Sequence, residues 1–386
     1  MSEMKGLQAK VCIITTVHPP FDTRIFHKQA KTLVRAGYDV TLIAQHGKNE
    51  VVDGVKVIGL PTPRNRFMRI FGLTWRAFRL ALRQRADVYH VHDPEILPWG
   101  WLLQKITHKP VIYDVHEYYA DSILTKEWVP AFFRGPLSKV VDKVEKMIAK
   151  RLAGVITVNR DMEGLFKGVN ENTITVHNYP FRAFVEKLND KLQADPFTVI
   201  YIGGVSKDCG YQVMVNTMQI VKGKERRASC IIVGPVDRAG LPEDFLSEEK
   251  SLLQEGGIEL VRKVPYEEIS QFLSTATIAW LPWPATPNNE KGTPVKLFEY
   301  MAARLPIVAS DMGFIKEIIE GNRCGLLAEP GNPEAHAESI LYLFEHPEER
   351  RRMGENGRRA VQEKYNWENE GKKLLALYEE LLNRAQ

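Results

Sequence analysis

The stretch from Asn289 to Asp311, NEKGTPVKLFEYMAARLPIVASD, constrains the fold of this chain more than any other segment. A Gly-Thr-Pro turn at 292–294 precedes ten residues that suit a helix, and Pro306 then leads into the apolar run 307–310. Loop, helix, tight turn and buried strand in this order form the repeating unit of parallel α/β sheets. We therefore expect an α/β fold built on parallel sheets.

The start of this helix is suited to binding a phosphate. A loop that runs into a helix offers unpaired N–H groups and the positive end of the helix dipole. Further along, Glu299 places a carboxylate between Phe298 and Tyr300 on an otherwise apolar helix. This carboxylate could accept hydrogen bonds from two sugar hydroxyls. The alternative is a capping charge or a solvated helix position.

The same segment resembles the donor-nucleotide segment of retaining GT-B glycosyltransferases of family 4, also called group 1. The likeness rests on Pro294-x-Lys296-Leu-Phe-Glu-Tyr-Met-Ala-Ala and on the strand that follows Pro306. It implies that Glu299 holds the nucleotide ribose, whereas the family's first Glu, eight residues earlier, falls on Lys291. By the same resemblance, the backbone that binds the phosphates is that of Gly292, Thr293, Pro294 and Val295.

Length and charge favour two domains. With 386 residues the chain is long enough for two hydrophobic cores. Residues 1–190 carry 28 Lys and Arg against 19 Asp and Glu, whereas the remainder carries 24 against 29. The resemblance implies two Rossmann-like, doubly wound domains that face each other across a cleft, with a C-terminal helix that crosses back to the first. The expected ranges are 1–185, 196–366 and 367–386, with a polar linker at 180–196.

The first domain opens with a βαβ pattern, a strand from residue 10, a loop, a helix over 25–36 and a second strand. Such a start binds its ligand in the loop after the first strand. The glycine fingerprint of dinucleotide sites is absent, which disfavours a dehydrogenase. The loop instead offers His18, Asp22 and Arg24, and it resembles the acceptor-side loop of the family. Alternatively, Asp22 caps the helix and Arg24 lies in solvent.

Two later strands of the first domain end in histidine and carboxylate groups. One carries His90 and His92, and the other runs into Asp114-Val-His116-Glu. The resemblance implies that His116 contacts the transferred sugar. A metal site on His90, His92 and His116 is the rival use, but no set of ligands is assembled by spacing. The resemblance implies that no metal or cofactor is needed, the nucleotide sugar being a substrate, and the chain has no Asp-x-Asp motif to hold a metal.

A second βα pattern starts at residue 197 and places Gly203-Gly204 in the loop before a helix over 210–222. The resemblance implies that both glycines line the donor site. In this loop the family usually has two basic residues, where this chain has Gly204 and Cys209. A leaving diphosphate needs fixed positive charge or aimed donors. The remaining candidates are Lys207, Lys296 and Arg24.

Residues 61–86 predict a basic amphipathic helix. The segment carries seven arginines between Arg64 and Arg85, no acidic residue, and Phe67, Phe71 and Trp75 among its aromatic residues. Such a helix can lie on an anionic membrane surface. Nucleic acid is disfavoured because no recognised nucleic-acid module surrounds the patch. The alternative is a helix that packs its apolar side on the sheet and leaves its arginines in water. Another charged amphipathic helix is expected over 139–152.

The expected function is that of a retaining, metal-independent hexosyltransferase. The donor would be a nucleotide diphosphate sugar, and the acceptor a hydroxyl of a glycan or lipid-linked acceptor in polysaccharide or glycolipid synthesis. Two other classes stay open, a non-catalytic GT-B subunit, favoured by Gly204 and Cys209, and a sugar-nucleotide epimerase. The four cysteines are far apart, and no window resembles a signal peptide or a membrane-spanning helix. We expect a soluble, cytoplasmic protein, peripheral on the inner face of the membrane where the basic segment binds.

Overall fold

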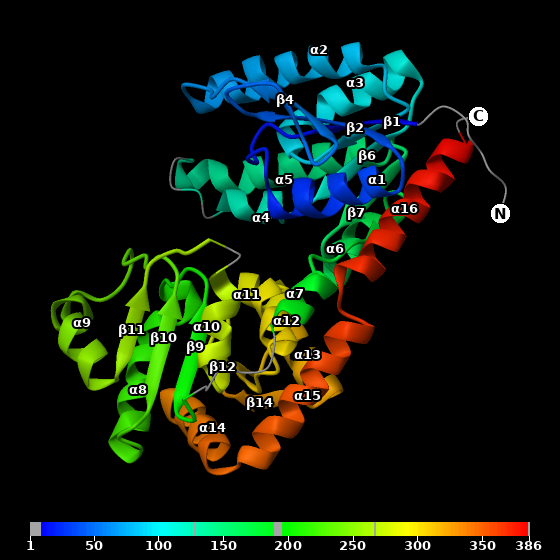
Figure 1. The fold of residues 1–386 in the computed structure, drawn as a ribbon. Coiled ribbons are helices and arrows are strands. Elements are labelled where there is room, and N and C mark those ends of the chain that lie inside the picture. Colours follow the sequence, from blue (N-terminus) through cyan, green and yellow to red (C-terminus); the bar gives the residue numbers. More distant parts are fainter. Residues whose placement is uncertain (1–8, 125, 127–128, 189–194, 266–267, 385–386) are drawn as a thin grey trace. The chain divides into compact units, whose positions relative to one another are not determined.

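The computed structural model describes residues 9–124, 126, 129–188, 195–265 and 268–384. The chain forms two compact units, drawn in Figure 1. Unit 1 comprises residues 1–178 and 369–386, and unit 2 comprises residues 179–368. Each unit is a mainly parallel sheet flanked by helices, so the predicted class of two Rossmann-like domains is confirmed.

Within the described residues, the sheet of unit 1 has the strand order β3-β4-β2-β1-β5-β6-β7-β8. The edge strand β3 pairs antiparallel with β4, and the other neighbours are parallel. The strands are β1 (Lys10–Ile14), β2 (Asp39–Gln45), β3 (Glu50–Val52), β4 (Val55–Leu60), β5 (Val88–Val91), β6 (Val111–Val115), β7 (Gly154–Thr157) and β8 (Thr173–Thr175).

The helices of unit 1 connect these strands as in other parallel sheets. They are the segment Thr23–Ala30 with α1 (Lys31–Arg35), the segment Met68–Leu73 with α2 (Thr74–Gln84), α3 (Leu97–Thr107), α4 (Tyr119–Leu124), α5 (Ala131–Ala149), α6 (Arg160–Lys167) and most of α16 (Trp367–Arg384). The second half of the basic segment packs Ala77, Phe78 and Ala81 into the core. This agrees with the alternative in which the helix packs its apolar side on the sheet.

The two faces of the unit 1 sheet differ in polarity. Alternate side chains of a strand point to opposite faces. Tyr89 and Val91 of β5 belong to the apolar core that α2 and α3 cover. His90 and His92 point to the other face, where Nδ1 of His90 lies 2.8 Å from the hydroxyl of Tyr378 on α16. Polar side chains therefore gather on this second face.

Unit 2 contains a fully parallel sheet, with the order β11-β10-β9-β12-β13-β14 among the described residues. The strands are β9 (Thr198–Ile202), β10 (Ser229–Val233), β11 (Ile258–Val261), β12 (Ile278–Leu281), β13 (Ile307–Ser310) and β14 (Gly325–Ala328). The helices are α7 (Arg182–Lys187), α8 (Tyr211–Lys224), α9 (Glu243–Glu255), α10 (Ile269–Thr275), α11 (Pro287–Lys291), α12 (Val295–Ala302), α13 (Gly313–Asn322), α14 (Pro333–Glu345) and α15 (Pro347–Glu363).

The segment predicted as a polar linker is in part folded. Residues 182–187 form α7, and Phe184, Val185 and Leu188 are buried in the core of unit 2. The linker prediction is wrong for this part, because three apolar side chains anchor an otherwise polar stretch. Residues 189–194 lie outside the described part of the chain.

Candidate active site

The first loop of unit 1 is organised by Asp93, which follows β5. Its Oδ2 accepts hydrogen bonds from the hydroxyl of Thr15 at 2.9 Å and from the backbone N–H groups of Thr16 at 2.6 Å and Val17 at 3.2 Å. Its Oδ1 lies 3.5 Å from Nε2 of His18. Burial raises the pKa of Asp93, although His18 and these hydrogen bonds oppose the rise. This carboxyl group therefore holds the predicted acceptor-side loop in place.

Asp22 and Arg24 make different contacts in the same loop. Asp22 caps the segment Thr23–Ala30, because its Oδ1 accepts from the backbone N–H groups of Arg24 at 2.8 Å and Ile25 at 2.9 Å. Arg24 is 3% exposed, and its Nε and Nη2 donate to Asp114 at 3.1 and 2.9 Å. The alternative of a capping Asp22 is confirmed, but a solvated Arg24 is wrong. This guanidinium can reach a ligand only if its ion pair breaks.

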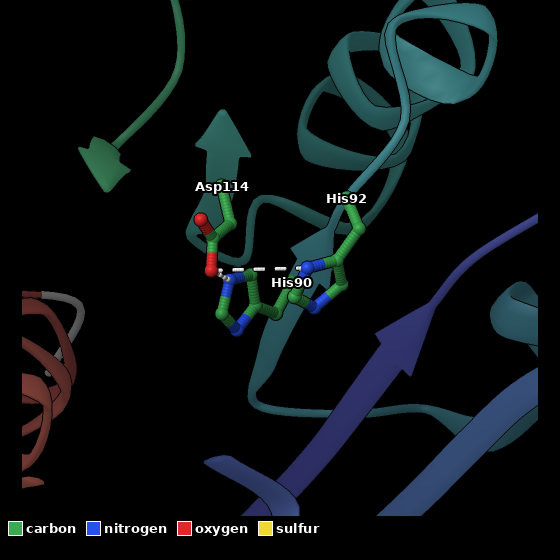
Figure 2. A group of neighbouring side chains, drawn as sticks. All are labelled: His90, His92 and Asp114. Carbon is green, nitrogen blue, oxygen red and sulfur yellow. Dashed lines mark ion pairs between the residues drawn. The ribbon is translucent and has the colours of Figure 1, made fainter. Parts of the chain in front are cut away.

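Figure 2 shows His90, His92 and Asp114, three buried side chains from β5, its following residue and β6. Nε2 of His90 lies 3.7 Å and Nδ1 of His92 lies 3.8 Å from Oδ2 of Asp114. The same Oδ2 already accepts hydrogen bonds from Arg24 and Gln29. Burial opposes ionisation of Asp114, but Arg24 and the neighbouring histidines together outweigh it and keep the pKa well below its usual range. The group fits a charge-balanced network better than a cation site.

His116 follows β6 and lies beside two other histidines. Its Nε2 is 2.8 Å from Nδ1 of His92, and its ring centroid is 5.0 Å from that of His18. Burial lowers the pKa of His116 to about 4, only partly opposed by Asp114, so the imidazole is neutral at neutral pH. The fold thus brings the predicted His116 and His18 together. A neutral imidazole at a strand end can form a hydrogen bond with a hydroxyl.

In unit 2 the loop after β9 closes over Lys296, in the first turn of α12. Nζ of Lys296 donates to the Tyr201 hydroxyl at 2.7 Å and lies 4.1 Å from the centroid of that ring and 5.6 Å from the Trp283 ring. A Cβ on Gly203, whose φ is +118°, would lie 2.6 Å from the same Nζ. The backbone conformation therefore favours glycine at this position, and any larger side chain would displace the end of the lysine.

The ammonium group of Lys296 lacks a carboxylate partner among the described residues, and its hydrogen bond goes to a neutral phenol. Burial lowers the pKa of Lys296 to about 8, although Cys209 and Glu299 favour the charged form. A half-buried cation whose hydrogen bond goes to a neutral hydroxyl attracts an anionic ligand. It also lies near the carboxyl end of β9, the edge at which open α/β sheets bind ligands.

Gly204 and Cys209 occupy the two positions at which the family usually has basic residues. Gly204 is exposed, and a Cβ there would approach no closer than 3.6 Å to Pro235, so a side chain fits. Cys209 is half-buried and ends the short turn Lys207–Cys209 before α8. Lys207 itself is exposed. Of the two lysines proposed as replacements in this unit, only Lys296 is enclosed.

The other predicted donor residues lie around the start of α12. Glu299 is 6% exposed, so a solvated position is wrong. The hydroxyl oxygen of Thr293 is buried without a hydrogen-bond partner in the described part of the chain. Pro294 is the N-cap residue of α12, and Gly292 follows α11.

Two residues that surround Lys296, Tyr201 and Trp283, were not predicted as site residues from the sequence. Tyr201 alternates with apolar residues in a buried strand, and Trp283 follows an apolar run, so both resemble core residues. Their position at the carboxyl ends of parallel strands is the signal that could have marked them.

Comparison with known proteins agrees with this geometry. The family models "Glycosyl transferase 4-like domain" and "Glycosyl transferases group 1" match residues 23–179 and 185–360. An MMP alpha-(1->4)-mannosyltransferase from Mycolicibacterium hassiacum is 30% identical over 339 residues, which cover 85% of this chain and 77% of that protein. The chain belongs to the group 1 glycosyltransferases.

More distant relatives of this glycosyltransferase cover nearly its whole length. It is 21% identical to the capsular polysaccharide biosynthesis glycosyltransferase CapM of Staphylococcus aureus, over 93% of this chain and 94% of CapM. The structure of Anabaena HepE in complex with UDP has a TM-score of 0.69 and 15% identity, and the match covers 97% of this chain and 100% of HepE. The latter likeness shows the GT-B fold. Within the described residues, no helix combines the length and the apolar character needed to cross a membrane.

Proposed function

We propose that this glycosyltransferase transfers a sugar from a nucleotide diphosphate donor to a hydroxyl of a glycan or lipid-linked acceptor. Retention at the anomeric carbon and independence from metals and cofactors are parts of the proposal. A role in cell-surface polysaccharide or glycolipid synthesis at the cytoplasmic side of a membrane is also part of the proposal. CapM, named for capsular polysaccharide biosynthesis, and HepE, solved with UDP, support this assignment.

The buried ammonium group of Lys296 carries the proposal. When the bond between the anomeric carbon and the diphosphate oxygen breaks, negative charge grows on that oxygen. The acceptor oxygen forms the new bond on the same face of the sugar, and its proton passes to the departing diphosphate. A fixed cation that meets this charge stabilises the transition state more than the ground state. The dipole at the start of α12 acts in the same direction.

The other residues take roles around this reaction. Glu299 binds the ribose hydroxyls, and His116 binds the transferred sugar. The Gly203-Gly204 loop admits the donor phosphates close to the backbone, and Lys207 is the second candidate for their charge. Phosphates bind the backbone of Gly292, Thr293, Pro294 and Val295, and the acceptor side is formed by His18, Asp22 and Arg24.

The proposal is tested first by a thermal-shift screen of nucleoside diphosphates, since a ligand that binds the native state raises its stability. The nucleoside diphosphate found in this screen is then supplied as its sugar conjugates, together with candidate acceptors. The anomeric configuration of the product is determined by NMR. We expect retention, and we expect turnover to survive EDTA. An inverted product, or loss in EDTA that manganese restores, would contradict the proposed mechanism.

A second candidate function is a non-catalytic subunit that binds nucleotide sugars. Gly204 and Cys209 favour it, because neither can supply the positive charge that the family usually has there. Nucleotide sugars without acceptor separate the classes, since a transferase hydrolyses the donor slowly, an epimerase changes the sugar and a binding subunit does neither. Binding without turnover by the wild type, unchanged in a Gly204→Arg/Cys209→Lys variant, would favour the binding subunit.

We also infer that unit 1 binds an anionic membrane surface through the segment Arg64–Arg85. The first part of this segment leaves Phe67, Phe71 and Trp75 exposed, with fractions of 71%, 59% and 45%. Arginines on the same segment are exposed as well, among them Arg76. Exposed aromatic and basic side chains together suit the interface of an anionic bilayer.

A second helix of unit 1 supports the same contact. α5 exposes apolar side chains at alternating spacings of four and three residues, which places them on one side of the helix. They are Phe133, Leu137, Val140, Val144 and Met147. Lys139 and Lys143 of α5 and Lys150 just after it are exposed, and the side chain of Asp142 is paired with Lys146. Like charges would oppose pairing with a second copy of α5, whereas they favour anionic lipid.

A further inference from the structure

We infer that Glu95 is a positioning residue that ties the acceptor-side loop of this glycosyltransferase to its membrane-binding segment. The inference rests on the proposed function, which gives the loop and the segment their roles. Glu95 lies in the short turn Pro94–Ile96 after β5, and its side chain is only 10% exposed. Its two carboxylate oxygens contact two different parts of unit 1.

One oxygen of Glu95 holds the loop. Its Oε1 accepts a hydrogen bond from the hydroxyl of Thr16 at 2.8 Å. Thr16 is fully buried, and its backbone N–H donates to Oδ2 of Asp93 at 2.6 Å. Oδ1 of Asp93 in turn lies 3.5 Å from Nε2 of His18. A displacement of Glu95 is therefore transmitted to His18 through Thr16 and Asp93.

The other oxygen of Glu95 holds the membrane-binding segment. Its Oε2 accepts a hydrogen bond from Nε of Arg69 at 3.1 Å. Arg69 lies in the helical segment Met68–Leu73, next to the exposed side chains that would enter the bilayer surface. Its own side chain is 31% exposed, so it can turn toward a lipid phosphate by rotamer changes alone.

Membrane binding and the Glu95 ion pair thus compete for the same guanidinium. Burial raises the pKa of Glu95, while its contacts with Thr16 and Arg69 oppose the rise. If Arg69 turns to a lipid phosphate, Glu95 loses the cation that stabilises its ionised form. Protonation or movement of Glu95 then alters the hydrogen bond to Thr16. By thermodynamic linkage, an acceptor bound at the loop changes the affinity for lipid by the same factor.

The experiment compares Arg69→Gln with Arg76→Gln in the full-length protein. Each variant removes one positive charge from the same segment, but only Arg69 contacts Glu95. We expect both to weaken binding to anionic phosphatidylserine vesicles by about fivefold, which corresponds to about 1 kcal/mol per charge. Only Arg69→Gln should speed hydrogen exchange at the amides of Thr16 and Val17 without vesicles. Only it should also change the KM for the acceptor.

A third variant, Glu95→Gln, keeps an oxygen that can accept from Thr16 but loses the charge that pairs with Arg69. In the wild type, vesicles should change the acceptor KM by about fivefold, and in Glu95→Gln they should not change it. Identical amide exchange in the two arginine variants would overturn the inference, as would an unchanged vesicle effect in Glu95→Gln. Failure of the proposed function appears separately, as absent sedimentation or absent transfer by the wild type, while the exchange comparison still decides whether Arg69 ties the loop.

Discussion

The two units treat buried charge and apolar surface in opposite ways. Unit 1 pairs the buried carboxylate of Asp114 with Arg24, yet it exposes many large apolar side chains on α5 and before α2. In the described residues of unit 2, Tyr342 is the one exposed large hydrophobic residue. In that unit the half-buried ammonium of Lys296 donates its hydrogen bond to the neutral hydroxyl of Tyr201. Unit 1 is thus left with exposed apolar surface, and unit 2 with a positive charge that can bind an anion.

This difference separates the two kinds of ligand. Partial burial of the ammonium of Lys296 costs free energy, and an anion bound beside it offsets that cost. Exposed apolar area surrounded by basic side chains is offset by an anionic bilayer. A paired network such as that of Asp114 needs no ligand and can hold polar side chains rigidly. The comparison supports the proposal that the donor diphosphate binds to unit 2 and the membrane to unit 1.

Breaking the paired network should have the largest effect. Asp114→Asn leaves the guanidinium of Arg24 buried without its counter-charge, and we expect a loss of about 3–5 kcal/mol in the free energy of unfolding. Denaturant titration measures it. The control is Asp53→Asn, which breaks an exposed pair with Lys31 and should cost at most about 1 kcal/mol. A loss below that of the control would show that the pair is not what holds this face.

The pH dependence of the Asp114–Arg24 pair follows from the direction in which the pKa of Asp114 is shifted. The pKa of Asp114 is lowered in the folded protein, so its stabilisation is complete above the unfolded pKa of about 4. It is lost as the pH falls from there through the lowered pKa. The Asp114→Asn variant should lack this contribution to acid unfolding.

The unpaired cation of unit 2 gives the next largest effect. Lys296→Gln should lower turnover by about 10²–10³-fold, because the charge it meets grows in the transition state. Donor affinity should fall much less. Lys207→Gln removes the second candidate cation, and because this lysine is exposed we expect it to lower turnover less. Equal, small effects of both variants would contradict the assignment of the diphosphate to Lys296.

The pH dependence of nucleoside diphosphate binding is a further test of the role of Lys296. Its pKa is lowered to about 8, so the unbound protein loses this positive charge as the pH rises through that value. Affinity for a nucleoside diphosphate should therefore fall above about pH 8 in the wild type. Lys296→Arg stays charged throughout and should not show this fall.

A smaller effect is expected from the ribose contact. Glu299→Ala should weaken nucleoside diphosphate binding by about 1.5–3 kcal/mol, the range for hydrogen bonds to a charged group. Isothermal calorimetry measures it. Glu290→Ala, an exposed position one residue from the family's first Glu, is the control and should leave affinity unchanged. If Glu299→Ala binds as tightly as the wild type, the ribose assignment is wrong.

Local pattern in the sequence was enough to place much of the fold. The strand at 307–310 was predicted at the observed residues because Pro306 precedes an apolar run, and the C-terminal helix that the resemblance implied over 367–386 is observed over Trp367–Arg384. The helix predicted from residue 139 begins at Ala131, since Pro136 lies inside it and hid the first turns. The polar residues of 180–188 likewise hid three core side chains. In these cases tertiary packing overrode local composition.

The site could be located from the sequence but its electrostatics could not. Strand ends and helix starts marked His116, Glu299 and Lys296 as candidates. The pairing of Arg24 with Asp114 and the enclosure of Lys296 by Tyr201 join residues about 90 positions apart. No local pattern reports such contacts, and they decide which charges are neutralised and which are left for a ligand.

The smallest effects are expected at the membrane surface. Each arginine of Arg64–Arg85 should contribute about 1 kcal/mol to binding of anionic vesicles, and this attraction should weaken with salt, because it is screened beyond roughly 8 Å at physiological ionic strength. Phe71→Ser should weaken sedimentation with such vesicles by about 1 kcal/mol, since the exposed ring no longer leaves water. Tyr342→Ser removes the corresponding exposed residue of unit 2 and should have no effect. Equal sedimentation of the wild type with neutral and anionic vesicles would show that these arginines lie in water and that the exposed apolar surface of unit 1 serves another partner.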